Sequence, residues 1–406
     1  MIKYEYIQGG ITAPKGFKAN GVHCGIRKNK LKKDLALIVA ETKCSAAAVY
    51  TQNLVKGAPL AVTKKNLSDG YAQAVICNSG NANTCNANGV EIAEQMCALV
   101  EQATGISKSD VIVASTGVIG QPLDITPIAN GMTGLVNGLG DNSHECAQAI
   151  MTTDTVKKEV AIKFMLGGKE CKIAGIAKGS GMIHPNMATM LVFMTTDVSI
   201  SSAMLQKVVS ADVKDTFNMI SVDGDTSTND MLTIMASGKA GNEEITSENA
   251  DYKTFKKMFN VVSSELCKKI AGDGEGATKL LECAVIGAQS KQTARTVAKS
   301  VITSSLFKSA MFGSDANWGR VLCAIGYSGA KLDVDKIDVS FSSSKGSILV
   351  CEGGRGVEFS EEKAKEILLE NKILIDINLN SGKQKATAWG CDLTYEYVKI
   401  NGDYRT

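Results

Sequence analysis

Strand-like and helix-like segments alternate along almost the whole chain, and this alternation limits the possible folds more than any other feature. Short runs of β-branched and apolar residues predict strands. They fall at 34–40, 72–78, 110–114, 158–164, 190–195, 231–236, 283–287, 347–351 and 391–400. Apolar residues at helical spacing predict helices at 90–104, 143–151, 201–217, 247–270, 292–304 and 361–371. The pattern predicts an α/β fold, but periodicity does not set the order of strands in a sheet.

The ends of several elements carry signals of their own. The chain has 39 glycines and only 5 prolines, so glycine is expected to make most turns. Gly105 is expected to end the helix at 90–104, because glycine readily takes the left-handed conformation found after helices. Ser143 is expected to cap one helix, and Ser201 or Ser202 another, because a serine oxygen accepts backbone N–H groups at a helix start.

Length and charge narrow the class of protein. A chain of 406 residues exceeds one ordinary core and predicts two or three domains. The net charge of +2 offers no strong field for nucleic acid or an anionic membrane. Residues 1–16 lack a basic region followed by an apolar run, and no apolar run reaches the roughly 20 residues of a spanning helix. We therefore expect a cytoplasmic protein that acts on small molecules, with no nucleic-acid or membrane partner.

Histidine and cysteine are placed in ways that argue against metal and triad chemistry. The three histidines are His23, His144 and His184, few for a histidine-dependent site. The twelve cysteines form no Cys-x-x-Cys pair and are interpreted as small buried hydrophobic residues. The spacing of His23, Cys24, Cys77 and Cys85 matches no standard zinc site, and Asp223 with Asp225 lacks the closing glutamate of an EF-hand. We expect no metal, and we interpret 223–225 as a structural loop.

Residues 177–190 carry the densest chemical signal. A Gly-Ser-Gly loop leads through His-Pro-Asn into an apolar run, and Thr189 stands where the loop becomes a predicted strand. For self-cleavage, a threonine hydroxyl attacks the carbonyl of the preceding residue. A small preceding residue helps this attack, and Ala188 is small. Hydrolysis of the resulting ester frees an α-amine, whose ordinary pKa of roughly 7.7–8.0 lets it act as a base without histidine. An Ala-Thr pair alone is equally typical of the start of a buried strand.

Residues 178–191 (KGSGMIHPNMATML) resemble the self-cleavage region of the ornithine acetyltransferases, also called glutamate N-acetyltransferases or the ArgJ family. Further blocks look like family blocks, in family order, over nearly the whole chain. They are 78–84 (NSGNANT), 114–120 (ASTGVIG), 151–155 (MTTDT), 223–230 (DGDTSTND), 272–279 (GDGEGATK), 315–320 (DANWGR) and 397–406 (YVKINGDYRT).

The resemblance implies a four-layer α/β/β/α sandwich of the self-processing DmpA and ArgJ type. It implies cleavage between Ala188 and Thr189, which would give an α chain of residues 1–188 and a β chain of residues 189–406. A smaller α/β subdomain is expected at roughly 285–385 of the β chain. The cut chains are expected to pair further into an α2β2 heterotetramer.

The resemblance also implies catalytic residues. Thr189 would be the nucleophile, and Thr116 with Gly117 would form the oxyanion hole. Glycine at 117 suits that role, because it lets a backbone N–H approach the acyl carbon closely. Without the resemblance, a Thr-Gly pair is most simply an ordinary turn. His184 lies near the cut, but the α-amine already serves as base, so we interpret His184 as loop structure or as help with cleavage.

Substrate contacts are implied by the same resemblance. They fall on Thr152, Lys178, Thr189, Glu275, Asn401 and Thr406. Lys178 would meet a substrate carboxylate and Glu275 the ornithine ammonium; each has the plain alternative of a solvated loop residue. Thr153 is an alternative to Thr152, because loop lengths around this block vary. The implied contacts of Asn401 and Thr406 would give the polar carboxyl terminus a role in substrate binding. Without them, this terminus is expected to be a frayed end.

The implied reaction is a ping-pong transfer of the acetyl group of N-acetylornithine to glutamate through an acetyl-threonine, in arginine biosynthesis. No cofactor is expected, and the motifs leave open whether acetyl-CoA is a further acetyl donor. One alternative is an amidase or aminopeptidase that uses the same threonine with water as acceptor. Another is an amino-acid-binding protein that keeps the fold without catalysis.

Overall fold

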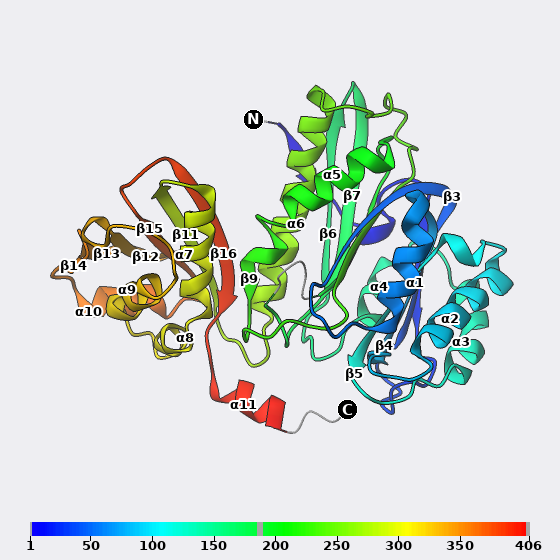
Figure 1. Cartoon of the computed structure of the whole chain (residues 1–406), viewed down its shortest axis with the longest axis horizontal. Coiled ribbons are helices and arrows are strands. Elements are labelled where there is room, and N and C mark those ends of the chain that lie inside the picture. Colours follow the sequence, from blue (N-terminus) through cyan, green and yellow to red (C-terminus); the bar gives the residue numbers. More distant parts are fainter. Residues whose placement is uncertain (1, 185–189, 403–406) are drawn as a thin grey trace.

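The computed structural model describes residues 2–184 and 190–402 of the chain. These residues form two β-sheets with their helices, which lie side by side along the long axis of the molecule (Figure 1). Short 3-10 turns lie at Gly10–Thr12, Leu67–Asp69, Lys108–Asp110, Phe217–Met219 and Val334–Lys336.

The larger sheet contains nine strands within the described residues, in the order β1-β6-β7-β8-β10-β3-β4-β5, with β2 paired to β3. Their bounds are β1 Tyr4–Tyr6, β2 Phe17–Val22, β3 Leu35–Tyr50, β4 Tyr71–Asn81, β5 Val111–Val118, β6 Lys158–Leu166, β7 Lys169–Lys178, β8 Leu191–Thr196 and β10 Met231–Ala236. β8 and β10 lie parallel to each other between β7 and β3.

The strand β3 is long enough to serve both halves of this sheet. Its first half pairs with β2 and β4, whereas its last half pairs with β10, where Tyr50 lies opposite Met231. The pairing with β4 shifts register between residues 39 and 44, where β3 changes partners. Apolar side chains of both halves meet in one core, which includes Ile38 of β3 and Phe193 of β8. The sheet therefore folds over on itself as a two-layer sandwich.

Helices cover both outer faces of the sandwich. On the β4–β5 side, α1 (Ala58–Asn66), α2 (Gly89–Thr104) and α3 (Thr126–Asn137) enclose a second core. On the β6–β7 side, α5 (Ser202–Asp212) and the long α6 (Ala250–Gly272) enclose a third core. The short α4 (Ser143–Ala149) packs against β2 and β3. This arrangement confirms the predicted four-layer α/β/β/α sandwich.

The second sheet is built mainly from the carboxyl-terminal portion of the chain. Within the described residues its order is β14-β13-β12-β15-β11-β16-β9. Its bounds are β9 Ile220–Ser221, β11 Leu280–Ala288, β12 Asp338–Ser343, β13 Gly346–Glu352, β14 Arg355–Gly356, β15 Lys372–Asn378 and β16 Gln384–Cys391. Its helices are α7 (Lys291–Thr303), α8 (Ser305–Phe312), α9 (Trp318–Gly326) and α10 (Glu361–Leu368). Apolar contacts run continuously from Phe259 of α6 to Val297 of α7, so the two sheets share one core.

The strand predicted at 391–400 is wrong. β16 ends at Cys391, and the following residues form the helix α11 (Tyr395–Gly402). The β-branched and aromatic residues of this stretch favoured a strand, but β16 already pairs with β11 and β9, and Tyr395 and Val398 lie exposed on the surface. Strand propensity depends on a neighbouring strand, and within the described residues no strand pairs with residues 395–402.

Some predicted helix boundaries are corrected as well. α5 ends at Asp212 rather than near 217, and α6 begins after Asn249, whose side chain accepts the N–H of Tyr252. Ser201 caps α5 as expected, and Gly105 takes the left-handed conformation after α2. Ser143 is not a cap: it lies inside α4, where its Oγ accepts the N–H of Ile11. Among the described residues, no helix has both the length and the apolar character to cross a membrane.

Candidate active site

A cavity of about 310 Å³ lies where β5 ends, where β7 ends, and where the loop before β10 returns to the sheet. We call it the site cavity. It brings together residues that the sequence singled out in separate blocks. They are Thr116, Gly117, Thr152, Thr153, Lys178, Glu275 and Asn401. Three further predicted positions, Ala188, Thr189 and Thr406, lie outside the described residues.

Met190, the residue after Thr189 in sequence, lines a small void that shares several wall residues with the site cavity. It is buried, and its carbonyl accepts the N–H of Met231 at the start of β10. A small void of about 20 Å³ lies between Met190, Thr116 and Lys178. The chain therefore enters β8 beside the predicted oxyanion residue and the predicted substrate lysine.

Thr116 and Gly117 occupy the end of β5, next to the end of β4. Gly117 has a φ of +134°, and a Cβ built there would lie 2.3 Å from the carbonyl carbon of Gly80. Both facts require glycine at this position. The close approach of the two strands brings the backbone of Thr116 and Gly117 to the wall of the cavity, where a backbone donor can meet a ligand.

Lys178 ends β7 and is 92% buried, with an exposed fraction of 8%. Within the described residues, its ammonium group makes no hydrogen bond or ion pair. Its positive charge acts to lower the pKa of the buried carboxyl groups of Asp154 and Asp230. A buried ammonium that faces a cavity without a direct partner is suited to bind an anionic group of a ligand.

Three loops around the site cavity are joined by a buried ion network of Asp154, Lys158 and Asp273. The Lys158 Nζ donates to Asp154 Oδ1 and to Asp273 Oδ2, each at 2.6 Å, and Lys158 is fully buried. Asp154 also accepts the N–H groups of Gly179 at 2.7 Å and Thr152 at 2.9 Å. The network therefore fixes the backbone directly after Lys178 and at the Thr152 loop.

The electrostatics of this network favour ionised carboxylates. Burial alone would raise the pKa of Asp154, but the positive charges of Lys158 and Lys178 and the N–H of Gly179 hold that pKa well below its usual range. Asp273 receives the N–H groups of Thr155 at 3.1 Å and of residue 156 at 3.3 Å. The network is fully hydrogen-bonded at these atoms, as a buried charge cluster must be.

Glu275 and Asn401 close another side of the cavity. Asn401 Nδ2 donates to Glu275 Oε2 at 2.7 Å, which joins α11 to the loop after α6. A Cβ on Gly181 would lie 2.4 Å from the carboxylate of Glu275, so a larger residue there would displace this carboxylate. Glu275 is almost fully buried and keeps one carboxylate edge on the cavity.

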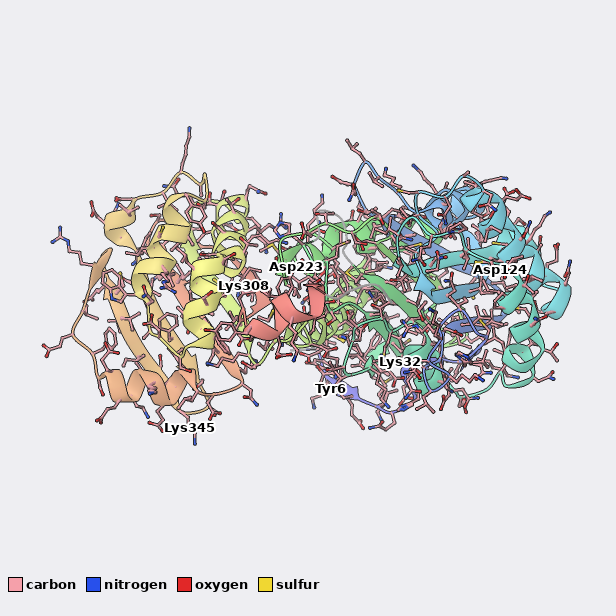
Figure 2. All side chains as sticks on the ribbon, turned by 90° about the horizontal axis from the view of Figure 1, so that it is seen from below. Tyr6, Lys32, Asp124, Asp223, Lys308 and Lys345 are labelled. Carbon is pink, nitrogen blue, oxygen red and sulfur yellow. The ribbon has the colours of Figure 1, made fainter. Side chains whose placement is uncertain are left out.

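α11 is also held by the loop at 223–225. Figure 2 shows α11 lying across the middle of the molecule beside the labelled Asp223. Burial and the nearby charge of Asp223 raise the pKa of Tyr397. Asp223 accepts the N–H groups of Met182 at 2.6 Å and Ile183 at 2.8 Å. These bonds confirm that residues 223–225 form a structural loop.

His184 has the surroundings of a structural residue. Its Nδ1 lies 3.0 Å from the Oγ of Ser221, and its carbonyl accepts the hydroxyl of Thr226 at 2.8 Å. Burial, helped by the charge of Lys299, lowers the pKa of His184 to about 4. The imidazole is therefore neutral near pH 7.

Among the described residues, no three His, Cys, Asp or Glu side chains lie close enough together to hold a metal ion. His23 instead contacts Asp34 at 3.3 Å and the carbonyl of Lys32 at 2.9 Å. The cysteines are unpaired, and most are buried as expected, although Cys85 and Cys323 are exposed.

Two residues of the site cavity were missed by the sequence interpretation. Asn229 lines the cavity, and Asp230 lies behind it in the adjoining void. Asp230 is buried, which raises its pKa well above the usual range, and its Oδ2 has no hydrogen-bond partner among the described residues. The only signal in the sequence is their place in the block 223–230, of which the first residues form a structural loop.

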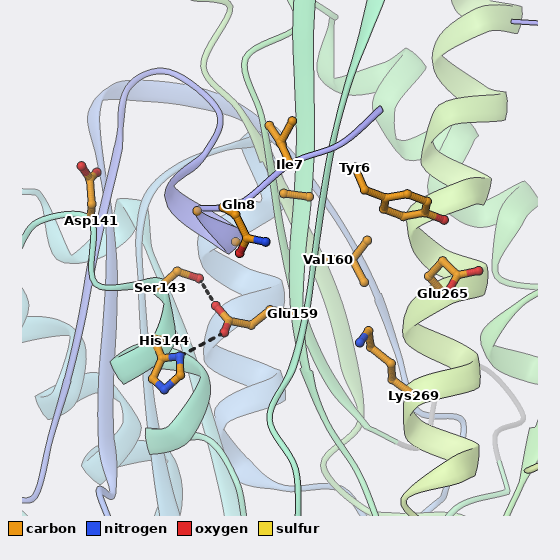
Figure 3. Close-up of a pocket in the computed structure, with 13 residues that line it drawn as sticks. Tyr6, Ile7, Gln8, Asp141, Ser143, His144, Glu159, Val160, Glu265 and Lys269 are labelled. Atoms are coloured by element: carbon orange, nitrogen blue, oxygen red, sulfur yellow. Dashed lines mark hydrogen bonds and ion pairs between the residues drawn. The ribbon is translucent and has the colours of Figure 1, made fainter. Parts of the chain in front are cut away.

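A second and larger cavity, of about 490 Å³, lies between the first residues of the chain, α4, β6 and α6 (Figure 3). We call it the α6 groove. Its polar residues are Tyr6, Gln8, Asp141, Ser143, His144, Glu159, Glu265 and Lys269. Glu159 accepts the hydroxyl of Ser143 at 2.5 Å and lies 3.7 Å from His144. None of the residues predicted for the site lines this groove.

Comparison with known proteins places the chain among close relatives over its full length. The sequence profile of the ArgJ family matches residues 18–406. The arginine biosynthesis bifunctional protein ArgJ 1 of Clostridium acetobutylicum is 50% identical over 98% of this chain and 97% of its own. The ArgJ protein of Caldanaerobacter subterraneus is 48% identical over 99% of this chain and 100% of its own.

A solved structure is similar as well. The crystal structure of arginine biosynthesis bifunctional protein ArgJ from Bacillus halodurans is 48% identical, with a TM-score of 0.51. The match covers 100% of that chain but 53% of this one. A solved chain of that protein is thus about half as long as the sequence described above.

Proposed function

The chain belongs to the ArgJ family, and from this premise we propose that it is an acetyltransferase of arginine biosynthesis that moves the acetyl group of N-acetylornithine to glutamate. The products are ornithine and N-acetylglutamate. The observation that supports this most directly is the site cavity, which gathers two oxyanion candidates, one buried cation and one buried carboxylate next to Met190. N-acetylornithine, with one α-carboxylate and one side-chain ammonium, matches this set of charges.

We propose that Thr189 carries the acetyl group. Its hydroxyl attacks the acetyl carbonyl of N-acetylornithine, its own α-amine takes the hydroxyl proton, and Thr116 and Gly117 donate to the oxyanion. When the tetrahedral intermediate collapses, the C–N bond breaks and the Thr189 ammonium returns the proton to the leaving ornithine nitrogen. The amine of glutamate then attacks the acetyl-threonine ester, which restores the free hydroxyl.

This chemistry requires a free α-amine, so cleavage between Ala188 and Thr189 is included in the proposal. The cut would leave a carboxyl-terminal piece of 406 − 188 = 218 residues, or about 54% of the chain. The solved Bacillus halodurans chain corresponds to 53% of this sequence, a share that supports a cut near the middle.

Substrate binding follows from the charges of the cavity. We propose that Lys178 binds the α-carboxylate shared by both substrates. Glu275, held by Asn401, binds the ornithine side-chain ammonium. Thr152 is placed by Asp154 at the cavity wall and is the proposed hydroxyl contact, with the adjacent Thr153 as its alternative. Thr406 completes the proposed set from the tail.

The proposal includes several wider features. The reaction needs no metal or organic cofactor, because nucleophile, base and oxyanion donors are all supplied by the chain. Acetyl-CoA is proposed as a second acetyl donor to the same threonine. The α and β chains are proposed to pair as α2β2 in the cytoplasm.

Replacing Thr189 tests the proposal. Thr189→Ala should remain a single chain of 42.8 kDa on a denaturing gel and should transfer no acetyl group. Thr189→Ser, which keeps a hydroxyl, should still be cut and should retain activity, and it controls for damage to the fold. Normal cleavage of Thr189→Ala would show that another residue is the nucleophile.

The acceptor separates acetyl transfer from the hydrolytic alternative. Labelled N-acetylornithine should yield N-acetylglutamate only when glutamate is present. Release of free acetate at a rate indifferent to glutamate would support an amidase instead. Incubation with acetyl-CoA and glutamate, without N-acetylornithine, tests the second donor.

A further inference from the structure

Asn229 makes four side-chain hydrogen bonds at the edge of the site cavity. Its Nδ2 donates to the carbonyls of Ala82 at 2.5 Å and Ser115 at 3.0 Å. Its Oδ1 accepts the hydroxyls of Thr84 at 2.5 Å and Thr228 at 2.6 Å. Two donors and two acceptor positions are all that an amide side chain has, so every one is used.

The bond to Ser115 acts directly on the predicted oxyanion segment. The carbonyl of Ser115 and the N–H of Thr116 belong to one planar peptide group and point in opposite directions, so the bond to Asn229 also fixes the N–H of Thr116 towards β4, with which Thr116 is paired. A hydrogen bond to the carbonyl also polarises the peptide and strengthens its N–H as a donor. Asn229 thereby controls the peptide that leads into Gly117.

The other bonds hold the segment that faces Thr116 and Gly117. Residues 82–84 pair with the end of β5: the N–H of Ala82 donates to Val118 at 2.9 Å, and the N–H of Gly120 donates to Thr84 at 3.0 Å. Asn229 bonds to both Ala82 and Thr84. It therefore fixes both sides of the turn that contains the oxyanion candidates.

The surroundings leave Asn229 little freedom. It is 6% exposed, and a Cβ on Gly57 would lie 2.4 Å from its Nδ2. The N–H of Gly57 in turn donates to the carbonyl of Thr228 at 2.9 Å. A side chain packed in this way holds one rotamer, which a residue that sets the geometry of a site requires.

We propose that Asn229 is the positioning residue of the oxyanion segment and holds Thr116 and Gly117 ready for the transition state. The proposal rests on the acetyl transfer proposed above. The bonds of Asn229 to Ala82, Thr84 and Ser115 all cross the predicted cut, because Asn229 follows residue 189 and its three partners precede it. After cleavage, the β chain would thus set the oxyanion hole of the α chain.

The test compares Asn229→Asp and Asn229→Ala with a matched variant, Asn66→Ala. The Nδ2 of Asn66 donates to the carbonyls of Lys108 at 3.0 Å and Val111 at 2.8 Å, at the opposite end of β5. Both Asn229 variants should lower kcat about 10- to 100-fold with little change in KM, somewhat less than the loss of an oxyanion donor itself. Asn66→Ala should leave kcat within about 2-fold, although it also removes two bonds to backbone carbonyls, one of them in β5.

Asn229→Asp is the sharper variant, because it keeps the shape and the acceptor but removes the two N–H donors. Full kcat in Asn229→Asp would overturn the proposal, as would an equal loss in Asn66→Ala. If both Asn229 variants fail to fold, kcat and KM are measured for Thr84→Val instead. It removes one donor to Oδ1 at nearly constant volume and should give the same split between kcat and KM with a smaller loss.

Amide hydrogen exchange separates failure of this inference from failure of the proposed function. Asn229→Ala should speed exchange at residues 115–118, whereas Asn66→Ala should speed it only near 108–113. If the wild-type protein transfers no acetyl group, the proposed function fails while exchange still decides the role of Asn229. Unchanged exchange at 115–118 would refute the positioning role even in an active enzyme.

Discussion

The site cavity and the α6 groove both depend on residues of β6, and they differ in what supports them. The neighbouring residues Lys158 and Glu159 of β6 point to opposite faces, as successive residues of a strand do. Lys158 enters the buried ion network behind the site cavity, whereas Glu159 lines the α6 groove. The groove is larger, at about 490 Å³ against about 310 Å³, yet it has no comparable buried support among the described residues. Convergent polar groups held by buried bonds identify the site better than volume does.

The largest difference is expected between Lys158→Met and Glu159→Gln. Removing Lys158 leaves Asp154 and Asp273 as buried carboxylates without their cation, which should cost about 3–5 kcal/mol of unfolding free energy. Glu159 is partly exposed, so Glu159→Gln should cost less than about 1 kcal/mol. Urea unfolding of both variants measures the contrast. Equal losses would mean that the ion network is no more important than the groove.

A smaller difference is expected between two glutamates. Glu275→Gln should raise the KM for N-acetylornithine about 10- to 100-fold, because a charge-assisted contact with the side-chain ammonium becomes a neutral one. Glu265→Gln, in the α6 groove, should leave both kcat and KM unchanged. Steady-state kinetics with each substrate gives the answer. A raised KM in Glu265→Gln alone would move ornithine binding to the groove.

The smallest effect concerns two histidines. Because the folded pKa of His184 is about 4, below its ordinary value near 6.5, the unfolded chain binds an extra proton between these pH values. His184 therefore makes stability fall as the pH drops from about 6.5 to 4. His184→Asn should reduce this fall, whereas His144→Asn, at a half-exposed ring in the groove, should not. Thermal unfolding from pH 4 to 7 makes the comparison, and identical curves for the two variants would contradict it.

The sequence predicted more of the residues that line the site cavity than of the residues that hold them in place. Lys178, Glu275 and Thr116 come from separate blocks, and the fold brings them to one cavity. Asn229 was missed because its role depends on bonds to residues 114 to 147 positions away, which no local pattern encodes. Thr189, the centre of the sequence argument, lies outside the described residues, and its role stays a prediction.

The fold was predicted best where local signals and packing agree. The helix α2 begins and ends within one residue of the pattern, because its apolar stripe and Gly105 point to the same boundary. β3 extends ten residues past the predicted strand, to Tyr50, because its second half is defined by pairing with β10. Residues 395–402 form the helix α11 and not the predicted strand, because no strand edge is available beside them within the described residues.

The placement of β8 and β10 between β7 and β3 determines how the protein could refold after a cut. Both inner strands belong to residues 189–406 and both flanking strands to residues 1–188. Before a cut after Ala188, threading the inner pair into the sheet is a unimolecular step. After it, the same step needs two separate chains to meet, so refolding becomes second order in protein concentration. Maturation would then turn a reversible folding reaction into a one-way assembly, with hysteresis between melting and cooling.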